Sequence, residues 1–181
     1  MSLKQILELP VEQKVGQLFF IGLPGPELDD QSKKILADIS PGGVCLFARN
    51  IREAGQTRKL LDGIREVLPI EPLLSLDQEG GLVDRLRRIL TPMPAASTIK
   101  SAEQAAELAR IISEAIRILG FNMDFAPVVD VVDGERSHYS NGLHARAFGT
   151  SAHTSIENPA GSLILSTGSL PVLLSAIADK P

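Results

Sequence analysis

Two carboxylates, two glycines and an arginine stand close together near the middle of the chain, in the segment Asp77-Gln78-Glu79-Gly80-Gly81 and at Arg85. Carboxylates accept hydrogen bonds from neighbouring hydroxyl groups, and arginine donates several hydrogen bonds from one planar fork. These residue types therefore suit the binding of a small molecule that carries several hydroxyl groups. An acidic turn in front of a solvated helix is the alternative interpretation of the same residues.

The elements around this segment predict where its side chains lie. The apolar run Pro72–Leu76 predicts a buried strand that ends at Asp77, and the run Phe125–Asp130 is a second apolar stretch that ends in a carboxylate. Ligands of parallel α/β proteins bind at the carboxyl ends of the strands. The two junctions therefore predict one polar site at that edge of a sheet.

Apolar runs alternate with amphipathic segments along the first 130 residues. Strands are predicted over Gly16–Leu23, Val44–Ala48, Pro72–Asp77 and Met123–Asp130, and helices over Asp30–Ile39, Ala54–Leu68 and Ser101–Gly120. Because parallel neighbours need a crossover connection, this order predicts an α/β fold with a parallel sheet. The order fits either a doubly wound sheet or a (β/α)₈ barrel. No Gly-x-Gly-x-x-Gly turn follows the first strand, which disfavours dinucleotide binding.

Composition narrows the possible partners. The chain has 181 residues, a one-domain length, and a formal net charge of −4 with scattered basic residues, so a nucleic-acid partner is not expected. No apolar stretch is long enough to span a membrane, and no signal peptide is evident. The single cysteine, Cys45, allows no disulfide within the chain, which suits the reducing cytoplasm where we expect the protein. The spacing of His138, His144 and His153 matches no zinc motif, and we predict neither a metal nor a cofactor.

Short motifs follow one another in a defined order from about Val15 to Gly149. They are Gly42-Gly43-Val44, Leu46–Asn50, Asp77–Gly81 with Val83 and Arg85, Pro94-Ala95, Asn122–Val128 with Asp130-Val131, and Arg146-Ala147-Phe148-Gly149. This ordered set resembles the N-terminal part of the glycoside hydrolase family 3 catalytic domain, and within that family it is most similar to the β-N-acetylglucosaminidase branch, also called β-N-acetylhexosaminidase.

The resemblance implies a TIM-like (β/α)₈ barrel, of which this chain would hold the N-terminal half, because a whole barrel typically needs about 250 residues. We therefore expect an incomplete barrel over residues 1–149 and a divergent tail over residues 150–181 that is rich in Ser and Thr. Our hypothesis for the tail is a segment read in a shifted frame. The DNA that encodes it would decide this.

The resemblance also implies roles for single residues. Asp77, Arg85 and Arg146 match the residues that contact the terminal sugar in the family, and Glu79 and Asp130 are expected to support them. A structural salt bridge with Asp130 or Glu79 is the alternative role for the two arginines. No catalytic residue is expected within the chain, because the family's carboxylate nucleophile and its acid/base residue match positions beyond residue 181.

The implied function is hydrolysis of terminal β-linked N-acetylglucosamine, with a muropeptide or another N-acetylglucosamine glycoside as substrate and peptidoglycan recycling as the process. A retaining mechanism is implied, and this chain by itself is expected to be an inactive fragment. Two alternatives remain open: a family member with β-glucosidase-like specificity, and a non-catalytic sugar-binding pseudoenzyme.

Overall fold

The computed structural model describes residues 7–128 and 142–147 of the 181-residue chain. The chain divides into two compact units. The first consists of Met1–Leu76 with Leu119–Asn122, and the second of Asp77–Ile118 with Met123–Pro181.

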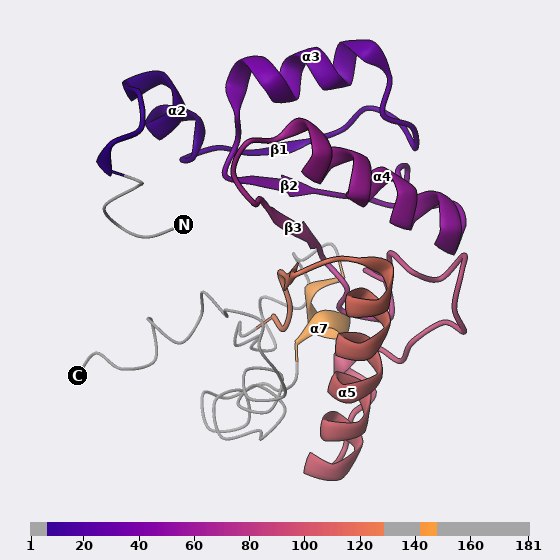
Figure 1. Cartoon of the computed structure of the whole chain (residues 1–181). Coiled ribbons are helices and arrows are strands. Elements are labelled where there is room, and N and C mark those ends of the chain that lie inside the picture. Colours follow the sequence, from indigo (N-terminus) through magenta and orange to yellow (C-terminus); the bar gives the residue numbers. More distant parts are fainter. Residues whose placement is uncertain (1–6, 129–141, 148–181) are drawn as a thin grey trace, which may run out of the picture. The chain divides into compact units, whose positions relative to one another are not determined.

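The first unit is built on a parallel sheet in the order β1-β2-β3, with β1 at Phe20–Gly22, β2 at Gly43–Cys45 and β3 at Leu73–Leu76. Figure 1 shows these three strands side by side. Ile21 lies beside Val44, and Val44 lies beside Leu74, so the three strands share one register. The prediction of an α/β fold with a parallel sheet is confirmed.

Three helices accompany this sheet: α2 at Val11–Gly16, α3 at Asp30–Ile39 and α4 at Ala54–Val67. Helix α3 packs against both α2 and α4. Apolar residues at helical spacing on α4 are buried together with the middle of the strands, as the sequence pattern requires. This core includes Leu36, Val44, Leu60, Leu61, Ile64, Leu74 and Leu76.

Shortening one core side chain tests this burial. Ile64 on α4 is fully buried, whereas Ile35 on α3 is 40% exposed. We expect Ile64→Val to lower the free energy of unfolding by about 1 kcal/mol, since it removes one buried methylene group. The matched variant Ile35→Val should change it little. Urea unfolding of the two variants measures both values, and equal losses would contradict the burial of α4.

The predicted first strand, Gly16–Leu23, is wrong at its beginning. Gly16 ends α2, and the amide groups of Gln17, Leu18 and Phe19 donate hydrogen bonds back to carbonyl groups of that helix. Those amides are therefore unavailable to a sheet, and only Phe20–Gly22 forms β1.

The second and fourth strands are also shorter than predicted. The β2 strand ends at Cys45 rather than at Ala48, because the side chain of Asn50 accepts a hydrogen bond from the amide of Phe47 and turns the chain. The fourth strand, β4, covers only Met123–Asp124. The last residues of the predicted strand, including Asp130, lie outside the described residues.

The second unit holds a short 3₁₀ helix, η1, at Ala96–Thr98, and α7 at Leu143–Arg146, which packs against it. Helix α5 spans Ala102–Leu119, and all of it except its last residue belongs to the second unit. Gly120 follows α5 with a φ of 104°, a conformation that suits glycine after a helix. No helix in the part of the chain that the structure describes is both long and apolar enough to cross a membrane.

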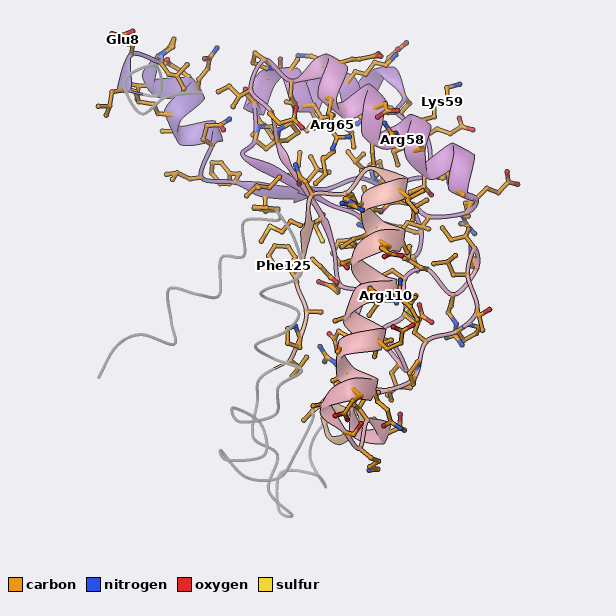
Figure 2. The ribbon with its side chains drawn as sticks, turned by 60° about the horizontal axis from the view of Figure 1, so that its bottom comes forward. Glu8, Arg58, Lys59, Arg65, Arg110 and Phe125 are labelled. Carbon is orange, nitrogen blue, oxygen red and sulfur yellow. The ribbon has the colours of Figure 1, made fainter. Side chains whose placement is uncertain are left out.

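Charged side chains on the two long helices are mostly paired within their own helix. Arg58, Lys59 and Arg65 extend from α4, and Arg110 extends from α5 (Figure 2). Arg110 is paired with Glu107 at 2.7 Å and with Glu114 at 3.0 Å, and all three side chains are about half exposed. Pairs of this kind contribute little to stability.

Candidate functional site

The strand β3 ends at Leu76, and the next residue, Asp77, forms an ion pair with Arg85. The Nη2 atom of Arg85 donates to Oδ2 of Asp77 at 2.9 Å. The side chains are 25% and 23% exposed, so the pair reaches solvent from a partly enclosed position. The sequence predicted both residues as sugar ligands, and the structure brings them together.

A second ion pair joins Glu79 to Arg146, which lies 67 residues later in the chain. Nε and Nη2 of Arg146 donate to the two carboxylate oxygens of Glu79, at 2.7 and 2.6 Å. Two parallel bonds to a carboxylate are the strongest arrangement for this pair of groups. Glu79 is buried, with 6% of its side chain exposed, whereas a third of Arg146 remains exposed.

The two glycines after Glu79 make a tight turn. Gly80 and Gly81 have φ values of 85° and 57°, which favour glycine. A Cβ atom on either residue would also collide with the chain at Pro94 and Ala95. The turn is closed by hydrogen bonds from the amides of Glu79 and Gly80 to the carbonyl of Val83, at 3.0 and 3.2 Å.

Gln78, between the two acidic residues, is fully buried and belongs to a network of polar groups. Its Nε2 donates to Oδ1 of Asp84 at 2.9 Å, and its Oε1 accepts from the amide of Leu86 at 3.0 Å. Oδ2 of Asp84 accepts from the amide of Met93 at 3.0 Å. These bonds tie the segment before the glycine turn to the segment after it.

Asp124, at the end of β4, holds the backbone of the same segment. Its Oδ1 accepts a hydrogen bond from the amide of Gln78 at 2.9 Å. Burial raises the pKa of Asp124 to about 7; the hydrogen bond from Gln78 opposes this rise, and the charges of Asp77 and Glu79 add to it. The low-dielectric surroundings and the two nearby negative charges therefore favour the neutral form of Asp124.

Sequence reasoning missed Asp124, although it lies within one of the quoted motifs. The predicted fourth strand continues to Asp130, whereas β4 ends at Asp124, so the carboxylate at the end of the observed strand is Asp124. An apolar residue precedes Asp124 and another follows it, which was the available signal for a partly buried carboxylate. Asp130 itself, predicted as a supporting residue, lies outside the described residues.

The groups around Asp77 and Arg85 suit a polar ligand. Within residues 7–128 and 142–147, no group of three or more His, Cys, Asp or Glu side chains is placed to hold a metal ion. The pair of Asp77 and Arg85 offers carboxylate acceptors and guanidinium donors side by side at a partly exposed position. A molecule with adjacent hydroxyl groups matches this combination.

Loss of Glu79 should destabilise the second unit. We expect Glu79→Ala to lower the free energy of unfolding by about 1–2 kcal/mol, because it removes two charge-assisted bonds while water still reaches the exposed part of Arg146. The matched change Glu107→Ala breaks the exposed pair with Arg110 and should have no resolvable effect. Urea unfolding of both variants measures the difference, and similar stabilities would contradict a structural role for the ion pair between Glu79 and Arg146.

The family model named Glycosyl hydrolase family 3 N terminal domain matches residues 10–167. A curated β-hexosaminidase of Pseudomonas aeruginosa is 36% identical over 121 residues, which is 65% of this chain and 36% of that protein. The chain therefore spans little more than a third of the length of this curated relative.

Two solved structures are similar in fold. A glycoside hydrolase family 3 β-N-acetylglucosaminidase from Paenibacillus sp. str. FPU-7 has 32% sequence identity and a TM-score of 0.77, over 87% of this chain and 31% of that one. A β-N-acetylhexosaminidase from Beutenbergia cavernae DSM 12333 has 26% identity and a TM-score of 0.77, over 91% and 53%. The predicted fold class, part of a TIM-like barrel, is confirmed by these structures. The predicted tail from residue 150 lies outside the described residues.

Proposed function

The chain belongs to glycosyl hydrolase family 3, and on that basis we propose that it forms the sugar-binding part of a glycosidase for terminal β-linked N-acetylglucosamine. The family membership supports the hydrolase class. The names of the relatives, a β-hexosaminidase and a β-N-acetylglucosaminidase, support the choice of sugar.

The observation that carries the proposal is the ion pair between Asp77 and Arg85, which presents acceptors and donors at a partly exposed position. A sugar with two adjacent hydroxyl groups can donate to the carboxylate and accept from the guanidinium at the same time. Arg146 is the third proposed sugar ligand, because a third of its side chain is exposed although Glu79 holds one edge of its guanidinium.

The residues described above bind the sugar in this proposal. Hydrolysis itself belongs to a protein as long as the relatives, of which this chain covers about a third. We further propose that the natural ligand is an N-acetylglucosamine glycoside such as a muropeptide, encountered during peptidoglycan recycling in the cytoplasm. The family resemblance supports these two points. Fractionation of cells followed by detection of the chain would test the location.

Calorimetric titration of the 181-residue chain with N-acetylglucosamine tests the proposal. Saturable binding of N-acetylglucosamine that is tighter than binding of glucose is the expected result. Tighter binding of glucose would instead favour the β-glucosidase-like alternative, and absence of binding to both sugars would overturn the proposal. Release of nitrophenol from an aryl N-acetylglucosaminide, measured in parallel, separates hydrolysis from binding alone.

A further inference from the structure

We propose that Gln78 and Asp84 act as a pair of positioning residues for the sugar site, through a buried hydrogen-bonded bridge that sets the geometry of Asp77 and Arg85. The inference rests on the proposed function, since it assigns a role to residues that support the same site. Neither Gln78 nor Asp84 is proposed to touch the sugar, because their side chains are 0% and 5% exposed.

Each side-chain nitrogen and oxygen atom of the bridge has a hydrogen-bond partner. The side-chain nitrogen of Gln78, Nε2, donates to one carboxylate oxygen of Asp84 at 2.9 Å, and the second oxygen accepts from the backbone amide of Met93 at 3.0 Å. The amide oxygen of Gln78 accepts from the amide of Leu86 at 3.0 Å. Buried polar groups that are fully satisfied hold one conformation, whereas loss of one partner leaves another group unpaired.

The position of the bridge in the chain gives it a role in the site. Gln78 directly follows Asp77, and Asp84 directly precedes Arg85. The bond between Gln78 and Asp84 therefore joins the two backbone segments that carry the ion pair, and the bond to the Leu86 amide fixes the residue after Arg85. A displacement of either segment would move Asp77 and Arg85 apart, and small displacements of binding groups are costly.

The chemistry of the bridge allows a specific rescue. Gln78→Glu would place one carboxylate against another, and Asp84→Asn would leave amide donors facing each other or facing the Met93 amide. The double variant Gln78→Glu/Asp84→Asn exchanges the carboxylate and the amide between the two positions. It restores one donor and three acceptors, so every bond of the bridge can form again with the central bond reversed.

Calorimetry with N-acetylglucosamine on the full 181-residue chain tests the proposal in the wild type, the two single variants and the double variant. We expect each single variant to bind about tenfold more weakly, since a buried group loses its partner, and the double variant to bind within about threefold of wild type. Single variants that bind as tightly as wild type, or a double variant as weak as the singles, would overturn the proposal. If a single variant does not fold, the affinity of the double variant alone decides: a value within threefold of wild type supports the proposal, and a weaker one overturns it.

A second measurement separates this inference from the proposed function. Hydrogen exchange of the Met93 amide and of the guanidinium of Arg85, followed by NMR without sugar, should be faster in the single variants and return to the wild-type rate in the double variant. If the wild type binds no sugar, the proposed function fails, and the exchange of Arg85 still decides whether the bridge positions the ion pair. An unchanged Arg85 signal in the single variants would overturn the positioning role even where Met93 exchange increases.

Discussion

Replacement of Asp77 by alanine should weaken the binding of N-acetylglucosamine by about 30- to 1,000-fold, because the variant loses two charge-assisted acceptors. The carboxylate stands beside Arg85 at 2.9 Å, so its removal also takes one acceptor from the guanidinium. The expected cost is about 2–4 kcal/mol, which combines the lost bonds with the desolvation of groups left without a partner. Calorimetric titration of the variant measures the loss.

Asp38→Ala is the matched control for this prediction. Asp38 is an exposed aspartate on α3 that pairs with Lys34 on the same helix, and no sugar contact is proposed for it. We expect its affinity for the sugar to equal that of wild type. Affinity of Asp77→Ala within threefold of wild type, or an equal loss in the two variants, would refute the assignment of Asp77.

Asp124→Asn should make the folded chain more stable at pH 8 and leave its stability unchanged near pH 4. Burial raises the pKa of Asp124 from 3.8 to about 7, so the folded state holds a proton that the unfolded state releases between these two pH values. Stability that depends on this proton is present below about pH 4 and is lost as the pH rises through 7. The neutral amide avoids this loss and still accepts the hydrogen bond from Gln78.

The expected gain at pH 8 is about 2–4 kcal/mol, because the pKa of Asp124 is about 7 in the folded chain and 3.8 without burial. Urea unfolding of wild type and variant from pH 4 to pH 8 checks it: the two curves should meet at the acidic end and separate steadily towards pH 8. Asp62→Asn, an exposed aspartate on α4, serves as control and should follow the wild-type curve. Parallel curves for Asp124→Asn and wild type would show that Asp124 is not a buried neutral carboxyl group.

The parts of the site that the sequence could predict are the parts that lie close together in the chain. Asp77 and Arg85 are eight residues apart and follow one apolar run, so a strand and a turn are enough to bring them near each other. The parallel sheet could likewise be predicted, because alternating apolar and amphipathic segments leave few other folds.

The remaining features depend on tertiary contacts that no local pattern encodes. The ion pair between Glu79 and Arg146 joins residues 67 positions apart, and its two parallel hydrogen bonds depend on the position of α7. Asp124 was overlooked because apolar residues continue beyond it, although β4 ends there. The first strand was predicted too early because Gly16–Phe19 is apolar enough for a strand, whereas its amides bond to the preceding helix.

The turn at Gly80 and Gly81 carries Leu82 at its tip, with 64% of that residue exposed. Its neighbours on both sides are restricted by the turn and by the buried bridge, whereas the Leu82 side chain makes no bond of that bridge and lies against Gly142, where an added Cβ would be 2.5 Å from Leu82 Cδ1. A smaller residue at position 82 should therefore leave every hydrogen bond of the bridge intact and change only the exposed tip of the turn and its contact with Gly142.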